Sequence, residues 1–182
     1  MRELSLHILD LARNCIEAGA TAMRIAVSES AAADELRIEI IDNGCGMDAE
    51  TLAHACDPFY TTRTTRRVGM GLSLFRETCE RCAGTMRVDS RPGEGTRVAG
   101  TLRLDHLDRP PLGDMGAAIA ALACEASRVR LTYKHTTDSE RFELDTGQVE
   151  EEFGPGALSH PATLLWLQEY IREGVQATGS TA

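Results

Sequence analysis

Residues 35–47, ELRIEIIDNGCGM, predict a strand of the sheet and a candidate site at its end. From Leu36 to Ile40 apolar residues alternate with charged ones, which is typical of a strand with one buried face. Two glycines, Gly44 and Gly46, then permit the tight turn of a loop. Asp42 stands at the junction, so we expect its carboxylate at the end of a strand.

The segments on either side of this stretch predict the order helix, two strands, helix, loop, helix and hairpin. Such an order favours an α/β (α+β) two-layer sandwich, in which helices cover one face of a sheet. The expected elements are a helix over 3–18, strands over 22–27 and 35–41, a helix over 48–55 capped by Asp48, a loop over 56–70, a helix over 71–82, and strands over 85–90 and 96–104 around the turn RPGEG.

A proline-rich stretch, DHLDRPPLGD, follows residue 104 and is typical of a linker. It divides the chain into an expected domain over 1–104 and a small C-terminal α+β module over 105–182. For the module we expect a helix over 113–127, a hairpin over 128–145 and a final helix over 161–174. No function is predicted for it.

Charge and composition exclude several classes of protein. The net charge is −9, with 13 arginines against 15 acidic residues over 1–104 and 6 basic against 13 acidic residues over 105–182. An acidic chain is a poor ligand for nucleic acid. No apolar run approaches the roughly 18 residues of a membrane span, and we expect a cytoplasmic protein. The single lysine, Lys134, lies in no GxxxxGK[ST] string, which excludes a P-loop.

The first motif that carries chemistry is LDLARNCIEAGA, residues 9–20, on the opening helix. Asp10 and Asn14 are four residues apart and so project from one helix face. An amide oxygen such as that of Asn14 is a suitable ligand for Mg²⁺. A carboxylate one turn away, at Asp10, is placed to orient or deprotonate a water or a hydroxyl group. The alternative is a solvated Asp10 and an exposed or capping Asn14.

The second motif is the loop after Asp42. An ionised Asp only accepts hydrogen bonds, so it suits an exocyclic amine such as that of adenine. Gly44 and Gly46 let the backbone turn and a flat base approach, and Met47 offers a polarisable wall to that base. The alternative is an ordinary Asp-Asn-Gly turn.

The third motif is RRVGMGLSLF, residues 66–75, a glycine-containing loop that runs into a helix. The free N–H groups and positive end of a helix suit phosphates. Hydroxyl and guanidinium groups just upstream are able to close over a triphosphate, and a threonine at a later strand start is able to reach the base. The candidate residues are Thr61, Thr62, Arg63, Gly69, Met70, Gly71, Leu72 and Thr96. The alternative is a solvated loop with a charged edge.

Together, NCIEAGA, DNGCGM, DPFYTT, VGMGLSL and GEGT resemble the GHKL superfamily of ATPases, which includes gyrase, ninety-kilodalton heat-shock chaperones, histidine kinases and MutL. The first two boxes resemble MutL most, and the later part resembles the catalytic domain of sensor histidine kinases. The resemblance covers residues 3–104. It implies a mixed sheet of the Bergerat fold, with ATP and Mg²⁺ held under a lid.

The resemblance also implies roles for single residues. Asn14 matches the magnesium ligand, Asp42 the adenine-binding Asp, and Thr96 the threonine near the base. Gly69 and Gly71 match the phosphate-side glycines. Asp10 falls where ATP-hydrolysing members place a Glu, and Arg63 where related lids carry a basic residue.

The chain departs from a sensor kinase because we expect no phosphoacceptor hairpin before the opening helix. His7 is expected to be a structural histidine of that helix. One hypothesis is therefore a regulatory kinase or ATPase in signal transduction that acts on a partner protein, as anti-sigma-factor serine kinases do. The alternatives are an ATP-gated protein-binding module without catalysis and a structural protein that keeps the fold. Oligomerisation is left open, and a further hypothesis places Lys134 at the terminal phosphate.

Overall fold

The computed structural model of the chain describes residues 3–57 and 70–182. Its strands are β1 (Ala22–Ser30), β2 (Glu35–Asp42), β3 (Met86–Arg91), β4 (Gly95–Arg103), β5 (Arg130–Thr136) and β6 (Arg141–Asp145). Its helices are α1 (Leu4–Glu17), α2 (Ala49–His54), α3 (Gly71–Arg81), α4 (Met115–Glu125), α5 (Thr146–Phe153), a 3₁₀ turn η1 (Ala157–Ser159) and α6 (Pro161–Ala177). No helix in these ranges combines the length and the apolar character that crossing a bilayer requires.

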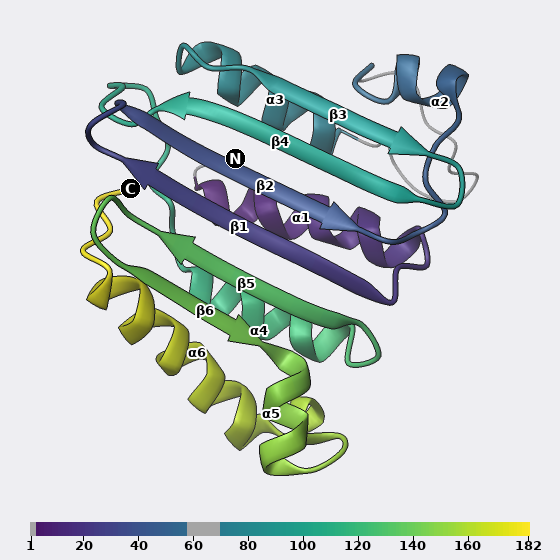
Figure 1. Cartoon of the computed structure of the whole chain (residues 1–182), viewed down its shortest axis with the longest axis vertical. Helices are drawn as coiled ribbons and strands as arrows, with labels where there is room; N and C mark the ends of the chain where they lie inside the picture. The colour runs from purple at the N-terminus through teal and green to yellow at the C-terminus, as the bar shows by residue number, and fades with distance from the viewer. Residues whose placement is uncertain (1–2, 58–69) are drawn as a thin grey trace.

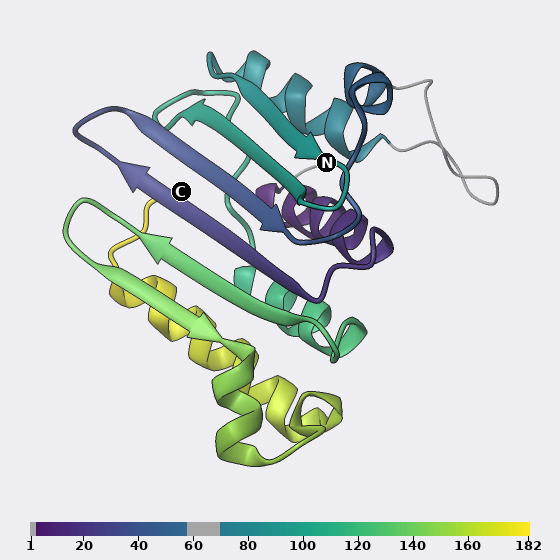
Figure 2. The ribbon, with the colours of Figure 1, turned by 45° about the vertical axis from the view of Figure 1, so that its right-hand side comes forward.

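The six strands form one sheet in the order β3-β4-β2-β1-β5-β6. Neighbouring strands are antiparallel except for β1 and β5, which are parallel, so the sheet is mixed. Helices α1, α3, α4 and α6 lie on one face of this sheet, as the two views in Figures 1 and 2 show. The predicted two-layer fold class is therefore confirmed.

The alternation in β2 determines which way Asp42 points. Leu36, Ile38 and Ile40 are at most 1% exposed and belong to the core between sheet and helices. Side chains two residues apart on a strand share a face, so Asp42 also faces the helix layer. Its side of the strand is the one that α1 covers (Figure 1).

Helices α1 and α2 form as the sequence predicts. Four apolar residues at helical spacing, Leu4, Ile8, Leu11 and Cys15, bury one face of α1. Asp48 caps α2, because its carboxylate accepts a hydrogen bond from the amide of Thr51 at 2.7 Å. The boundaries of both helices agree with the predicted ones to within about one residue.

The C-terminal segment extends the sheet of the N-terminal segment. Strand β5 pairs in parallel with β1, from Ala22 opposite Arg130 to Ser28 opposite Thr136. The amides of Leu4 and Ser5 also donate hydrogen bonds to the carbonyl groups of residues 111 and 112. The two predicted segments, 1–104 and 105–182, therefore share a single sheet.

Helix α5 was not among the expected elements. Its sequence, TGQVEEEF, buries only Thr146 and Val149, so it has no apolar stripe of helical period to detect. Its start is marked by Asp145, whose carboxylate accepts a hydrogen bond from the amide of Gly147 at 2.9 Å. A short polar helix of this kind is stabilised by its cap and its contacts more than by its own pattern.

A buried hydrogen-bond network ties residues near position 180 to β1. The carboxylate of Glu29 accepts hydrogen bonds from Nε2 of His135 at 2.7 Å and the hydroxyl of Ser180 at 2.5 Å. The amide of Thr181 donates a further bond to it at 2.9 Å. Because burial alone would raise the pKa of Glu29, the hydrogen bonds must outweigh it, and they lower this pKa from 4.5 to about 2.

We expect this network to make the protein less stable in acid. A carboxyl group whose pKa is lower in the folded state stabilises that state above its unfolded pKa, and the contribution is lost as the pH falls through the folded pKa. The window for Glu29 runs from pH 4.5 down to about 2, and the contribution is on the order of 3 kcal/mol. Denaturant unfolding of the wild type and of Glu29→Gln should show a difference at pH 7 that shrinks toward pH 2. A difference independent of pH would contradict this account.

Candidate functional site

The start of α3 meets the middle of α1, which brings the first and third sequence motifs together. A Cβ atom placed on Gly71 would lie 3.6 Å from Cβ of Asp10 and 3.7 Å from Nδ2 of Asn14. Asp10 and Asn14 are both half-buried on α1, one turn apart. The start of α3 therefore lies next to both side chains.

The end of β2 meets the same helix, which adds the second motif. Asp42 is 7% exposed, and its Oδ1 accepts a hydrogen bond from the amide of Gly44 at 2.7 Å. Burial and then the negative charge of Asp42 raise the pKa of the Cys15 thiol, which lies against that carboxylate. Since Cys15 follows Asn14 directly, the described parts of all three motifs meet along one stretch of α1.

The two glycines of the loop make room for the protein's own backbone. Gly46 has φ of +66°, and a Cβ atom there would lie 1.9 Å from the carbonyl oxygen of Arg91. A Cβ atom on Gly44 would lie 2.8 Å from Cβ of Ala18. The loop is thus packed between the end of α1 and the β3–β4 turn, which holds Asp42 in place.

A hydrogen-bonded cluster on β3 and β4 completes this side of the site. The hydroxyl of Ser90 donates to the carbonyl of Gly95 at 2.9 Å and lies 2.9 Å from Oγ1 of Thr96. Ser90 has one hydrogen to give, so the hydroxyl of Thr96 supplies the second bond and its oxygen stays an acceptor. The amide of Met47, which is half-buried, donates to Ser90 at 2.8 Å.

Ser90 was missed as a site residue. The predicted hairpin around RPGEG could have pointed to Ser90, because such a hairpin brings Ser90 and Thr96 to opposite positions on neighbouring strands. Thr96 in turn lies opposite Asp42 on β4 and β2. Cross-strand pairing therefore aligns three oxygen-bearing side chains across the ends of three strands.

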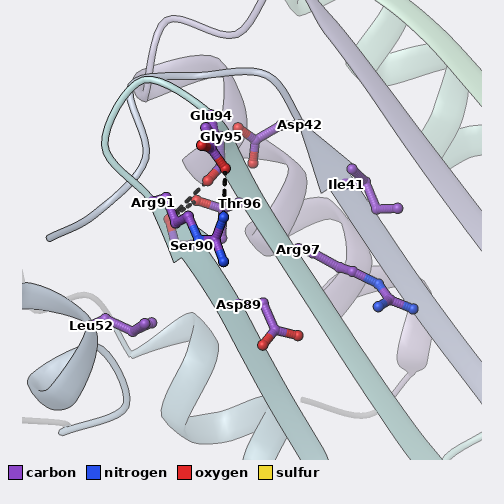
Figure 3. Close-up of a pocket in the computed structure, with 10 residues that line it drawn as sticks. All are labelled: Ile41, Asp42, Leu52, Asp89, Ser90, Arg91, Glu94, Gly95, Thr96 and Arg97. Carbon is purple, nitrogen blue, oxygen red and sulfur yellow. Dashed lines mark hydrogen bonds and ion pairs between the residues drawn. The ribbon is translucent and has the colours of Figure 1, made fainter. Parts of the chain in front are cut away.

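A hollow of about 440 Å³ opens at these strand ends. Figure 3 shows it between β2, β3 and β4, with Leu52 of α2 among its lining residues. It shares Asp42 and Thr96 with the predicted site, and Asp10 and Asn14 do not line it. The hollow thus overlaps the part of the candidate site that contains Asp42 and Thr96.

Several predicted site residues lie outside the described ranges or at their edge. Thr61, Thr62, Arg63 and Gly69 fall within residues 58–69, which the structure does not describe. Met70 is 47% exposed and precedes α3. Leu72 is half-buried in the first turn of that helix and packs against the core.

The hypothesis that Lys134 reaches a terminal phosphate is wrong. Along β5 the buried residues that face the helices are Leu131, Tyr133 and His135, so Lys134 projects from the opposite face. It also lies two strands away from Asp42 in the sheet. A side chain on that face points away from α1 and Asn14.

His7 has a structural place in α1, as predicted. It is 1% exposed, its ring lies 5.8 Å from that of Phe75, and its Nε2 is 3.3 Å from the hydroxyl of Thr78. Burial, with help from the charge of Arg81, lowers the pKa of His7 to about 4. The ring is therefore neutral at pH 7 and packs between α1 and α3.

The sheet is mixed, and helices cover one of its faces. Asn14 of α1, Asp42 at the end of β2 and Gly71 at the start of α3 meet along one stretch of α1. This combination defines the class of histidine-kinase-like ATPase domains. Residues 2–106 match the family model described as "Histidine kinase-, DNA gyrase B-, and HSP90-like ATPase". This match covers more than half of the chain, and the chain belongs to that family.

Sensor kinases are among its relatives. Sensor protein kinase FleS of Pseudomonas aeruginosa is 40% identical over 105 residues, which make up 58% of this chain and 25% of that protein. The Non-motile and phage-resistance protein of Caulobacter vibrioides is 32% identical over 126 residues, or 64% of this chain and 15% of that protein. The chain thus spans a quarter or less of the length of these relatives.

Two solved structures share the fold. The N-terminal domain of a DNA repair protein superposes with a TM-score of 0.61 at 17% identity, covering 86% of this chain and 58% of that one. The Aquifex aeolicus MutL ATPase domain complexed with ADP gives 0.53 at 15% identity, covering 84% and 69%. Because both cover more of the chain than the family model does, the likeness in fold extends beyond residue 106.

Proposed function

We propose that this chain binds Mg-ATP between α1, the end of β2 and the start of α3, and acts on a partner protein as a regulatory kinase or ATPase. The observation that carries the proposal is the convergence of the three motifs. A Cβ atom placed on Gly71 would lie 3.7 Å from Nδ2 of Asn14, and the residue after Asn14, Cys15, lies against Asp42. Membership of the ATPase family supports the same function.

The base end of the site suits adenine. Asp42 is buried and only accepts hydrogen bonds, and Thr96 opposite it presents an oxygen acceptor. The amino group of adenine has two hydrogens to donate, whereas guanine carries a carbonyl group at the same ring position. The carboxylate would repel that carbonyl, so the site should prefer ATP to GTP.

The phosphate end suits a nucleotide–magnesium complex. Helix α3 starts at Gly71, and its free N–H groups and positive end favour phosphate oxygens. The side-chain amide of Asn14 lies beside that start, with Nδ2 nearest to Gly71, and its oxygen is a hard ligand of the kind Mg²⁺ takes. When bound, the metal would neutralise phosphate charge. We propose that Thr61, Thr62, Arg63 and Gly69, which lie outside the described residues, contribute to binding the phosphates.

Asp10 is proposed as the catalytic carboxylate. It lies one turn before Asn14 and beside Gly71, so it borders the phosphate end of the site. In that position it can accept a proton from a water or from the hydroxyl group of an incoming protein. We propose that the acceptor belongs to a partner protein in the cytoplasm, because His7, the histidine of α1, is buried and has a structural place in this chain.

Exchanges at Asp10 and Asn14 test the proposal. Asp10→Asn should keep ATP affinity within a few-fold but abolish turnover, because an amide takes no proton at neutral pH. Asn14→Ala should remove most of the magnesium dependence of binding, because a ligand of the metal is lost. Binding is measured by calorimetry with and without Mg²⁺, and turnover by release or transfer of labelled phosphate.

Comparing the wild type with Asp10→Asn distinguishes a kinase or ATPase from an ATP-gated binding module. If both the wild type and Asp10→Asn bind Mg-ATP and neither turns it over, the chain is an ATP-gated binding module, in which the nucleotide orders a surface for a partner. If neither binds ATP, the proposed function is wrong in both forms.

A further inference from the structure

Aromatic side chains gather on the C-terminal part of the chain, far along the sheet from the candidate nucleotide site. The whole chain has only eight aromatic residues among 182. Four of them form one contiguous row of rings: Phe153, Trp166, Tyr170 and Phe142. The ring centroids are 5.0 Å apart for Phe153 and Trp166, 5.1 Å for Trp166 and Tyr170, and 5.4 Å for Tyr170 and Phe142.

Most of this row lies on the surface. Phe153 is 50%, Trp166 40% and Tyr170 41% exposed, and Leu165 beside them is 68% exposed. Phe142 is the inner end, because its ring fills the space above Gly174. Contiguous exposed apolar side chains mark interaction surfaces, and aromatic residues are enriched at protein–protein interfaces.

The row belongs to α5 and α6, at the β6 edge of the sheet (Figure 1). On α6, Leu165 lies on the side away from the buried Leu167 and Ile171, and Trp166 and Tyr170 lie one turn apart on the flank between the two sides. This outer side of α6 and the end of α5 therefore have apolar side chains with no element of the described chain over them. The nucleotide site is at the other edge, by β2, β3 and β4 (Figure 2).

The rim of the row is acidic. Glu152 directly precedes Phe153, and on α6 Glu169 and Glu173 follow Trp166 and Tyr170 by one turn each. Glu152 and Glu173 form no ion pair with any residue in the described ranges.

The cation beside this face is already paired. Arg172 is held by Asp114, at 2.5 Å, and by Glu169, at 3.2 Å. The surface therefore presents aromatic rings within a negative rim.

We propose that Phe153, Leu165, Trp166 and Tyr170 form a docking surface for a basic, amphipathic segment of a partner protein. Apolar side chains of such a segment would cover the rings, and its lysine or arginine side chains would meet Glu152, Glu169 and Glu173. An arginine or lysine above Trp166 or Tyr170 would gain a cation–π contact as well. The inference does not depend on nucleotide binding, because none of these residues lies at the nucleotide site.

The single tryptophan makes the proposal directly testable. Trp166 is the only tryptophan of the chain, so its emission reports on this surface alone. The probe is a helical peptide of lysine and leucine, without tryptophan, in which leucines recur at positions i, i+3, i+4 and i+7. The control peptide has glutamate in place of every lysine.

With the full chain, the basic peptide should shift the emission of Trp166 to the blue in a saturable way, and the shift should weaken as salt is raised. Tyr170→Ala should weaken binding about tenfold or more, as the loss of an aromatic anchor does. Glu173→Lys should also weaken it. Leu107→Ala is the matched control, because Leu107 is 98% exposed but is not part of the row.

Several outcomes would overturn the proposal. One is the absence of any emission change with the basic peptide, and another is equal binding of both peptides. A blue shift with protein concentration alone would mean that a second copy covers the surface. A shift with phosphatidylcholine vesicles in the absence of peptide would mean that lipid covers it. Circular dichroism of each variant confirms that it is folded.

Discussion

Asp42→Asn is expected to weaken the binding of Mg-ATP roughly five- to 150-fold, which corresponds to about 1–3 kcal/mol. Asp42 is 7% exposed and faces the helix layer, so under the proposed function its carboxylate would meet the base where water is largely excluded. An amide in its place presents either an oxygen without charge or an amino group that opposes the amine of adenine. Calorimetry with ATP measures the loss.

Asp42→Asn should leave the fold intact. The oxygen of an asparagine can still accept the hydrogen bond from the amide of Gly44, which is 2.7 Å long in the native protein. The melting temperature without nucleotide should therefore stay close to that of the wild type. Equal ATP affinity in both proteins would show that Asp42 does not bind the base, and equal affinity of the wild type for GTP and ATP would contradict the assignment of adenine.

Gly46→Ala is expected to destabilise the protein by about 3 kcal/mol or more. A Cβ atom at this position would lie 1.9 Å from the carbonyl oxygen of Arg91, and φ is +66°. The left-handed backbone costs a non-glycine residue about 1 kcal/mol, and the overlap with backbone adds roughly 1–3 kcal/mol. For a chain of this size the melting temperature should fall by roughly 6–12 °C.

Gly93→Ala is the matched control. Gly93 has a similar φ of +77°, but a Cβ atom there would have no neighbour within 4 Å. Gly93→Ala should therefore lower the free energy of unfolding by only about 1 kcal/mol, the cost of the left-handed backbone for an alanine. If both exchanges lowered the melting temperature equally, the close packing of the loop against Arg91 would not matter for stability.

Local patterns in the sequence account for most of the N-terminal half. The alternation from Leu36 to Ile40 predicts a strand with one buried face and Asp42 at its end, and the four-residue spacing of Asp10 and Asn14 predicts that they share a helix face. Both features depend on the repeat of a strand or a helix. They hold in the structure because neighbouring residues alone determine them.

Features that depend on distant parts of the chain were not predictable in this way. The parallel pairing of β5 with β1 joins residues more than 100 positions apart, and no local pattern specifies it. The same pairing places Lys134 on the face opposite to α1, which excludes the role suggested for it. Ser90 is a related case, because its importance comes from the hydrogen bonds it makes to Gly95 and Thr96 across the hairpin.

Titration of ATP into the full chain by isothermal calorimetry, with and without Mg²⁺, tests the central claim most directly. We predict saturable heat with one site per chain in the presence of Mg²⁺, and much weaker binding without it, because Asn14 acts through the metal. Absence of heat with Mg-ATP would contradict the account, because three motifs that converge on a nucleotide site would then bind no nucleotide.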